Sequence, residues 1–399
     1  MPFPDAYAGR PAGHAVTRPL VYLDNAATTF PKPAGLLEEM AETYARIGVS
    51  PGRGNYDLAM MAGDLVDRTR RKVASLFGAT DPNRVIFAAN ATDALNTVIL
   101  GIVRPGDHLV ATRLDHNSVL RPLHHLAAAG AITYDLAPFD AGGFVDADAV
   151  ARLIRPNTRA VVMCRASNVL GTIQPIAEVG RVCADRGVPL VVDAAQGAGQ
   201  VPIDMTALGI SGLAFTGHKS LYGPSGIGGL VLGPDLDPET TRFGGTGMDS
   251  ASLVHSQGYP MRLEAGTLNL LGVIGLSLGI DFVVSAGLDE ILAREMSLLR
   301  RLRDGLADCP GVTLYHASDL AGHLPVLTAN VTGVHPQDVG AILDGDYGIA
   351  VRVGLHCAPM VHRALGTIDR GAVRFSLGAF NTTDDIDLAI AAMEAIARR

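Results

Sequence analysis

Short runs of branched apolar residues recur along the first two thirds of the chain and alternate with stretches of helical length. The runs lie at 84–89, 107–112, 159–167, 189–195, 212–217 and 228–233. Because strands of a buried parallel sheet are apolar on both faces, this alternation predicts an α/β architecture with a mostly parallel sheet. Helices are predicted over 64–78, 92–103 and 175–187, the first from apolar positions on one face followed by Gly78.

The pattern changes after about Tyr259. Longer helical stretches and short strands follow, at 269–287, 289–309, 323–333 and 372–378, with a closing helix from Thr383 onward. This change predicts a smaller α+β domain at the C-terminal end.

Three segments are therefore expected. They are an N-terminal arm over 1–20, a large ligand-binding domain over 21–258 and a small domain over 259–399, packed against part of the N-terminal segment. A length of 399 residues agrees with this division, because it exceeds the usual size of a single-core domain.

Charge and hydropathy exclude several classes of partner. Forty acidic and 32 basic residues give a formal net charge of −8, so neither nucleic acid nor an anionic membrane is an expected partner. The N-terminus lacks the pattern of a signal peptide, and Asp281 interrupts the longest apolar run, 270–284. A cytoplasmic protein is expected.

The four cysteines are Cys164, Cys183, Cys309 and Cys357. Their spacing matches neither a disulfide framework nor a zinc site, so each is expected to be a free thiol and no bound metal is expected.

Four polar motifs stand at the ends of predicted strands. In chain order they are ANATDALN, SNVLGT, VVDAAQ and TGHKSLYGPSG. Because ligands of open α/β sheets bind outside the carboxyl ends of the strands, the four motifs are expected to converge on one ligand.

Each motif has a functional and a structural interpretation. Asn90 to Asp93 can hold a phosphate at a helix N-terminus or simply form a capping turn. Asp193 ends an apolar strand and needs a cationic partner, which can be a protonated pyridine nitrogen or a basic side chain. Lys219 can form a Schiff base with an aldehyde if it is held in a partly dry crevice, or it can be a solvated surface charge.

In this order the motifs resemble those of the class V aminotransferase family, within the fold-type I pyridoxal-phosphate enzymes. The resemblance runs from LDNAATTFPKP near Leu23 to FSLGAFNTTDDID near the C-terminus, and it is strongest to cysteine desulfurases and selenocysteine lyases. It implies a seven-stranded, mostly parallel sheet between helices, bound pyridoxal 5'-phosphate and a homodimer.

The resemblance also implies roles for individual residues. Lys219 would carry the cofactor as a Schiff base, Asp193 would pair with its pyridinium nitrogen, and His116 would stack on its ring. The catalytic residues would be Lys219, Cys357 and His116. The cofactor-binding residues would be Ala91, Thr92, His116, Asn168, Asp193, Gln196, Thr216, His218 and Lys219, with Thr267 supplied by the second subunit. The substrate-binding residues would be Asn25, Ala26, Asn168, Arg352 and Arg374, the last gripping the substrate carboxylate through its guanidinium.

Cys357 distinguishes sulfur chemistry from transamination. The segment RVGLHCAP resembles the short loop that carries the nucleophilic cysteine of desulfurases that depend on an acceptor protein. The neighbouring His356 is expected to help lower the thiol pKa. Two other interpretations stay open, namely a metal site formed with His356 and His362, for which no fourth ligand is evident, and an inert thiol.

The expected reaction converts L-cysteine to L-alanine and leaves a persulfide on Cys357 for transfer to an acceptor protein. Two departures from the family pattern concern the substrate pocket: Tyr56 ends the segment 52–56, where a histidine is common, and Leu355 replaces a second histidine. A selenocysteine lyase, another C–S lyase or an aminotransferase on the same fold therefore stays open. A catalytically silent sulfur-transfer partner is a further alternative.

Overall fold

The larger part of the protein is built on a seven-stranded sheet. The computed structural model describes residues 20–51, 54–247, 251–317 and 319–399, so all but the last residue of the predicted arm over 1–20, and the loop residue Arg53, lie outside the described residues. The strand order is β2-β8-β7-β6-β5-β3-β4, and only β8 runs antiparallel to its neighbours. The strands are β2 (Val85–Ala88), β3 (Asp107–Thr112), β4 (Ile132–Ala137), β5 (Thr158–Cys164), β6 (Leu190–Asp193), β7 (Gly212–Thr216) and β8 (Gly228–Leu232). The predicted α/β class with a seven-stranded, mostly parallel sheet is confirmed.

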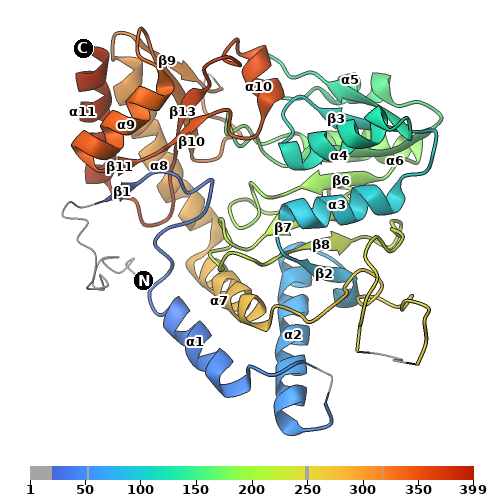
Figure 1. Ribbon diagram of the computed structural model, residues 1–399. Helices are drawn as coiled ribbons and strands as arrows, with labels where there is room; N and C mark the ends of the chain where they lie inside the picture. Colours follow the sequence, from blue (N-terminus) through green and yellow to red (C-terminus); the bar gives the residue numbers. More distant parts are fainter. Residues whose placement is uncertain (1–19, 52–53, 248–250, 318) are drawn as a thin grey trace.

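Helices cover both faces of this sheet (Figure 1). Strand β5 is apolar on both faces. Ala160 and Val162 pack in one apolar cluster with helices α3 and α4, and Val161 and Met163 pack in another with α2, α6 and α7. The helices of this part are α1 (Leu36–Ile47), α2 (Asp57–Leu76), α3 (Ala91–Ile102), α4 (Asn117–Ala128), α5 (Ala147–Leu153), α6 (Ile176–Arg186) and α7 (Leu270–Ala286), with a short 3₁₀ turn at Pro82–Arg84.

The start of α2 corrects a prediction. The helix begins at Asp57 rather than Asp64, because its first turns expose Leu58, Met60 and Met61 and so lack the one-sided apolar pattern on which the prediction rested. The helices predicted over 92–103 and 175–187 match α3 and α6 to within one residue at each end.

The C-terminal part forms a separate antiparallel sheet, in the order β12-β13-β10-β9. Its apolar face packs against helices α8, α9 and α11, and the cluster includes Leu299, Leu327, Leu343, Phe375 and Ile386. The elements are α8 (Leu288–Ala307), β9 (Val312–Tyr315), β10 (Val326–Val331), α9 (Pro336–Tyr347), β11 (Ile349–Ala350), β12 (Arg352–Gly354), α10 (Pro359–Ala364), β13 (Ala372–Ser376) and α11 (Thr383–Ala397).

The N-terminal segment connects these two parts. Strand β1 (Val21–Tyr22) pairs in parallel with β11, and the Ser376 amide donates to the Leu23 carbonyl at 2.7 Å. A few residues later the Thr29 amide donates to the His218 carbonyl, beside the large sheet, at 3.1 Å. The segment therefore crosses between the two sheets, as Figure 1 shows in blue.

Within the described ranges, no single helix has the length and apolar composition needed to cross a membrane. Helices α7 and α8 meet that test only as a pair that is bent by 78°.

A buried ion pair joins α2 to the segment before α7. Arg70 and Glu264 form two hydrogen bonds, of 2.8 and 2.6 Å, and their side chains are only 5 and 8 % exposed. Glu264 also accepts from the Phe87 amide of β2 at 2.5 Å. This carboxylate therefore ties a helix, a strand and a loop together in a place with little water.

Replacement of Glu264 by Ala should lower the free energy of unfolding by about 3 kcal/mol or more, because it leaves the Arg70 charge buried without its partner. Chemical denaturation followed by circular dichroism measures the change. The exposed pair Arg181–Glu178 offers a control, since Glu178→Ala should cost about 1 kcal/mol or less. Equal losses in the two variants would contradict the assignment.

Candidate active site

One cavity, of about 290 Å³, lies at the carboxyl ends of the parallel strands. Strands β5, β6 and β7 end in it, helices α3 and α4 begin at it, and residues from the N-terminal segment and the C-terminal part close it. It brings together thirteen of the fifteen residues to which the resemblance assigned roles: Ala26, Ala91, Thr92, His116, Asn168, Asp193, Gln196, Thr216, His218, Lys219, Arg352, Cys357 and Arg374. Two others, Asn25 and Thr267, do not line it.

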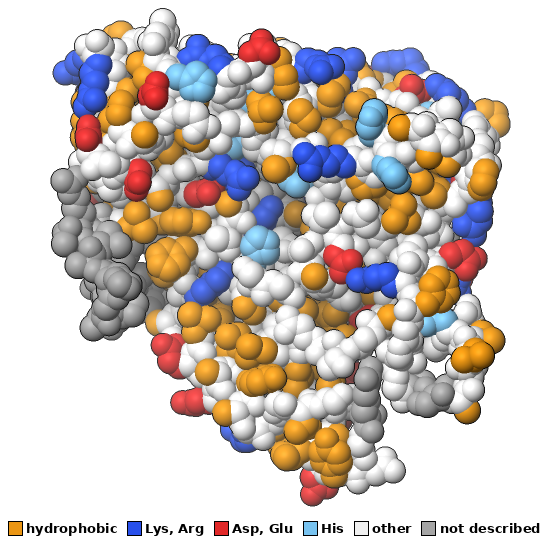
Figure 2. All heavy atoms as spheres, in the orientation of Figure 1, with side chains coloured by type: hydrophobic (Ala, Val, Ile, Leu, Met, Phe, Trp, Pro, Cys, Tyr) orange, Lys and Arg blue, Asp and Glu red, His pale blue; other side chains and the backbone are white. Residues whose placement is uncertain are grey.

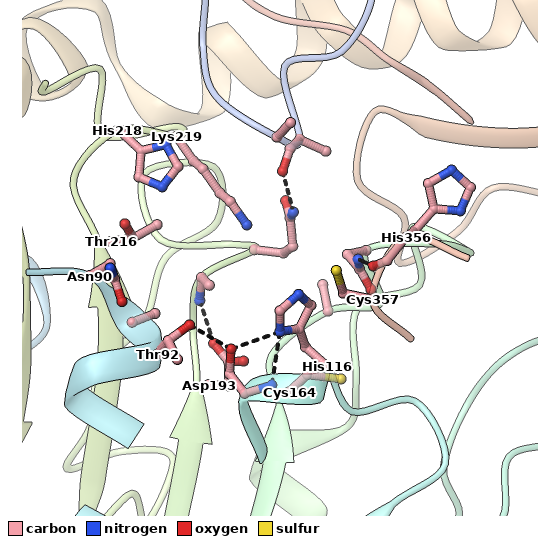
Figure 3. A pocket seen from close by; sticks show the side chains of 18 of the residues that line it. Asn90, Thr92, His116, Cys164, Asp193, Thr216, His218, Lys219, His356 and Cys357 are labelled. Atoms are coloured by element: carbon pink, nitrogen blue, oxygen red, sulfur yellow. Dashed lines mark hydrogen bonds between the residues drawn. The ribbon is translucent and has the colours of Figure 1, made fainter. Parts of the chain in front are cut away.

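Lys219 points into the middle of the cavity (Figure 3). The pKa of its amine is lowered to about 8, mainly by burial and also by the charges of Arg374 and Arg352, while Asp193 opposes the shift. Asp193, at the end of β6, is 4 % exposed and accepts from the Ala195 amide at 2.9 Å. Burial raises the pKa of this carboxyl, although the Ala195 amide and Lys219 act in the other direction. Each group therefore influences the pKa of the other across a buried part of the cavity.

The backbone at Lys219 is held by the N-terminal segment. The carbonyl oxygen of His218 accepts from the Thr28 hydroxyl at 3.0 Å, the Thr29 amide at 3.1 Å and hydroxyl at 3.2 Å, and the Lys32 ammonium at 3.0 Å. The Thr29 hydroxyl also lies 3.0 Å from the Lys219 carbonyl. These contacts fix the main chain from which the Lys219 side chain extends.

Polar groups without partners gather on one side of the cavity. Thr216 Oγ1 and His218 Nδ1 are buried and have no hydrogen-bond partner among the described residues. Ala91 and Thr92 lie beside them in the first turn of α3, where amide groups lack acceptors within the helix. Gly228 allows this close approach, because a side chain there would meet the Phe215 carbonyl oxygen at 2.5 Å and Asn90 Cα at 2.9 Å. The arrangement offers donors to an anion at a helix N-terminus.

His116 stands at the N-cap of α4, on the opposite side from Thr216 (Figure 3). Its Nδ1 accepts from the Ser118 amide at 3.0 Å, so its remaining proton lies on Nε2. The Ser118 hydroxyl contacts both His116 Nδ1 at 2.8 Å and the Thr92 hydroxyl at 2.7 Å. Burial lowers the pKa of His116 to about 4, helped by the charge of Lys219, so the ring is neutral near pH 7.

The two amide side chains also have partners in the protein. Gln196 donates to the Ala26 carbonyl at 2.9 Å, and Asn168 donates to the His356 carbonyl at 2.7 Å. Each amide nitrogen keeps a second hydrogen for a ligand. The sequence did not indicate that Asn168 also holds the loop of Cys357.

Arg374 is buried at 2 % exposure in β13. It pairs with Asp24 at 2.7 Å and donates to the Asn168 carbonyl at 3.0 Å, while its Nε has no partner within the described chain. Arg352 lines the same cavity and is exposed to solvent. By contrast, the amide of Asn25 donates to the Ser376 carbonyl at 3.1 Å and contacts the Asn381 side chain at 3.4 Å, away from the cavity.

Cys357 is the one partly exposed thiol in the described ranges, since Cys164, Cys183 and Cys309 are buried. Its sulfur faces the cavity, whereas the ring of His356 turns away from it (Figure 3). Burial lowers the pKa of His356 to about 2, so this neutral ring does not supply the positive charge that the sequence analysis expected to stabilise the thiolate. The described residues also contain no group of three or more His, Cys, Asp or Glu side chains that could hold a metal ion.

A second buried carboxyl group, which the sequence did not indicate, lies beside the cavity. Asp115 accepts from the Thr112 amide at 2.7 Å and from its hydroxyl at 2.8 Å. Burial raises the pKa of Asp115 to about 7, and the nearby Asp193 contributes to the shift. Cys164 lines the cavity close to both carboxyl groups, and burial raises its thiol pKa. Their positions could have indicated that Asp115 and Cys164 lie near the cavity, because Asp115 directly precedes His116 and Cys164 ends a strand.

The fold and the cavity define an α/β enzyme that holds its ligand at the strand ends around a buried lysine and aspartate. The chain belongs to the class-V aminotransferase family, whose model matches residues 21–388. Members of this family depend on pyridoxal phosphate.

Relatives and solved structures agree with this family. A probable cysteine desulfurase of Halalkalibacterium halodurans is 35% identical over 378 residues, covering 92% of this chain and 91% of the relative. A cysteine desulfurase of Dickeya dadantii is 34% identical over 390 residues, with 96 and 93% covered. The apo structure of the cysteine desulfurase from Thermococcus onnurineus NA1 superposes with a TM-score of 0.88 at 34% identity, covering 95% of both chains.

The lowered pKa of Lys219 predicts its reactivity in the cofactor-free protein. Because the neutral amine is the nucleophile, acylation of Lys219 should rise with pH around a midpoint of about 8, well below the ordinary lysine value of 10.5. Trace labelling with acetic anhydride followed by peptide mass spectrometry gives the midpoint. Asp193→Asn should move it lower still, whereas a midpoint of about 10 in the native protein would show that Lys219 is not desolvated.

Proposed function

We propose that this protein is a pyridoxal-phosphate-dependent cysteine desulfurase that forms a persulfide on Cys357. The observation that carries the proposal is the meeting of Cys357 and Lys219 in one cavity, although they are far apart in the sequence. A class-V aminotransferase needs no thiol opposite its lysine for amino-group transfer. The names of the relatives and structural neighbours point to the same activity.

The residues of the cavity fit pyridoxal phosphate. Thr216, His218 and the first turn of α3 would hold its phosphate, because their buried donors have no other partner. Asp193 would pair with the ring nitrogen and Lys219 with the aldehyde carbon. When bound, the cofactor supplies an electron-poor ring that stabilises negative charge at the substrate Cα.

Other residues orient the ring and the substrate. His116 would stack on the ring as a neutral imidazole, and Gln196 and Asn168 would each offer their second amide hydrogen to the cofactor's phenolic oxygen. The free Nε of Arg374 and the guanidinium of Arg352 would bind the substrate carboxylate, with Ala26 at the wall of the pocket. We assign Asn25 a structural part instead, because its side chain bonds the β13 region.

In the proposed reaction, the neutral amine of Lys219 takes the proton from the substrate Cα. The Cys357 thiolate then attacks the sulfur of L-cysteine, forming an S–S bond while the substrate Cβ–S bond breaks. The electron pair of that bond stays on the carbon skeleton, which is protonated and released as L-alanine. The persulfide sulfur is next passed to the thiol of an acceptor protein or released as sulfide by a thiol reductant.

Selenocysteine is the second candidate substrate after L-cysteine, since the same residues would bind it. In a C–S lyase or an aminotransferase on this fold, Cys357 would have no role in the reaction. In a silent sulfur-transfer partner, the buried Lys219 and Asp193 would have no role. The presence of all three groups in one cavity therefore supports the desulfurase.

A matched pair of variants tests the proposal. With L-cysteine and a thiol reductant, Cys357→Ser should lose at least about 100-fold in sulfide release but keep the visible absorption of the bound cofactor. Lys219→Ala should lose that absorption and the activity together. The control is Cys309→Ser, a buried thiol outside the cavity, which should keep both. Sulfide release at the normal rate by Cys357→Ser, or keto acid as the main product, would refute a persulfide on this residue.

A homodimer is the second part of the proposal, and an apolar surface supports it. Hydrophobic side chains gather over the lower part of the face shown in Figure 2, where Figure 1 places α1 and α2. The exposed large hydrophobic residues of α1 and α2 are Leu37, Tyr44, Leu58, Met60 and Met61. Such a contiguous patch is typical of an interface between subunits. Thr267 is exposed and outside its own subunit's cavity, as expected for a residue that reaches the partner's phosphate site. We also propose a division into a large and a small domain at 258/259, with α7, which follows this boundary, packed against the large sheet.

The double substitution Met60→Glu and Met61→Glu should convert the dimer to monomers, because it places charges in the centre of an apolar contact. Light scattering coupled to size-exclusion chromatography measures the mass. Cofactor affinity should fall about tenfold or more as Thr267 is lost from the site. A matched pair of substitutions on another exposed side, Arg152→Glu and Arg181→Glu, should leave the mass unchanged. A dimeric mass in the methionine variant would place the interface elsewhere.

A further inference from the structure

Cys357 stands in a reverse turn with an unusual backbone. The Ala358 amide donates to the Leu355 carbonyl at 2.9 Å, and the two central residues have positive φ values of 52° for His356 and 56° for Cys357. Two positive φ values in succession define a type I′ turn, which normally selects Asn and Gly at these positions. His and Cys do not favour this conformation, so neighbouring contacts have to maintain it.

Two of those contacts hold the main chain of the turn. The His356 carbonyl accepts from the Asn168 side chain at 2.7 Å, and the Cys357 carbonyl accepts from the Asn117 amide at 2.8 Å. Asn117 begins α4 and Asn168 follows β5, so both anchors belong to the large sheet. The turn itself comes from the C-terminal part of the chain.

The third contact is the His356 ring, which is buried behind the turn. It stacks on His362 with ring centroids 5.3 Å apart, and His356 Nδ1 lies 3.2 Å from His362 Nε2. His362 Nδ1 lies 2.8 Å from the Thr367 hydroxyl, and His356 Nε2 lies 3.3 Å from the Arg352 carbonyl. The four groups form a continuous chain of hydrogen bonds.

One arrangement of protons satisfies every link of this chain. Thr367 donates to His362 Nδ1, His362 Nε2–H donates to His356 Nδ1, and His356 Nε2–H donates to the Arg352 carbonyl. The opposite arrangement would set the lone pair of His356 Nε2 against that carbonyl oxygen, so that two acceptors face each other. In the favoured arrangement both rings are neutral and both nitrogens of His356 are occupied.

Burial keeps both rings neutral. For His356 the charges of Arg374 and Arg352 add to the effect of burial, which lowers its pKa to about 2. Burial lowers the pKa of His362 to about 4. A ring that is neutral, fully bonded and turned away from the sulfur is unable to accept the thiol proton.

We propose that His356 and His362 are positioning residues, whose buried hydrogen-bond chain to Thr367 holds Cys357 in a type I′ turn and so aims its thiol into the cavity. The chain acts through geometry and not through proton transfer to or from the thiol. This inference rests on the proposed function for the role of Cys357 in the reaction, but the turn and its support are independent of it.

A pair of substitutions at His362 separates the hydrogen bond from the bulk of the side chain. His362→Leu removes the partner of His356 Nδ1, whereas His362→Gln keeps a polar group at a similar reach. The control is His124→Leu, because His124 is exposed on α4. Each holoenzyme is assayed for the visible absorption of the cofactor, for kcat and KM with L-cysteine, and for the pH dependence of Cys357 alkylation by iodoacetamide, followed by peptide mapping.

His362→Leu should lower kcat at least about tenfold, because a displaced nucleophile loses its near-attack geometry, with KM changed by less than about twofold. His362→Gln should recover most of the rate. The midpoint of alkylation against pH should stay within about 0.3 pH unit of the parent in both variants, since no charge is removed. Should His362→Leu fail to fold, Thr367→Val breaks the same chain with little change in volume and should lower kcat in the same way.

Three results would overturn the inference. They are a kcat for the variant with the broken chain within about twofold of the parent, no recovery in His362→Gln, and a rise of the alkylation midpoint by about one pH unit, which would mean that the histidines act by charge. If instead Cys357→Ser released sulfide normally, the proposed function would fail, while the alkylation rates would still report whether the turn holds the thiol.

Discussion

The position of Lys219 depends on a single carbonyl oxygen. His218 offers that oxygen to the hydroxyl of Thr28, to the amide and hydroxyl of Thr29 and to the ammonium of Lys32, all within one short stretch of chain. The same stretch continues from the strand that pairs with β11, so the C-terminal sheet is fixed relative to the lysine by way of this oxygen. Arg374 and the thiol of Cys357 come from that C-terminal part. Together with the direct bonds from Arg374 to the Asn168 carbonyl and from the Asn117 amide to the Cys357 carbonyl, this contact sets how the three groups lie relative to one another.

The sequence was sufficient for the fold class and for most of the residues in the cavity. Continuous apolar runs such as that of β5 report burial on both faces, and burial on both faces requires helices on both sides of the sheet. The polar residues at the carboxyl ends of these strands were therefore expected to lie together at one edge of the sheet. For Asp193 and Lys219 the residues alone left a structural interpretation open, and the resemblance to a family was needed to assign their roles. Cys357 needed the resemblance to a family, since an isolated cysteine has little meaning in a sequence.

Features that depend on side-chain direction were beyond the sequence. Asn25 and Ala26 are neighbours, yet only Ala26 reaches the cavity, because the Asn25 amide is held by the Ser376 carbonyl. His356 adjoins the thiol in the chain, but its ring points the other way and is paired with His362. The early start of α2 was missed for a related reason: its first turns expose apolar side chains, so periodicity within one chain carries no signal there.

The anchoring of the Cys357 turn limits how sulfur can leave the protein. A cysteine on a long, free loop could carry its cargo outward to a distant receiver. Here the carbonyls of His356 and Cys357 are bonded to Asn168 and Asn117, which precede or begin elements of the large-sheet part, so the turn that carries the thiol is fixed in place. In the proposed reaction, an acceptor thiol would therefore have to come to Cys357, because Cys357 would not swing out to it.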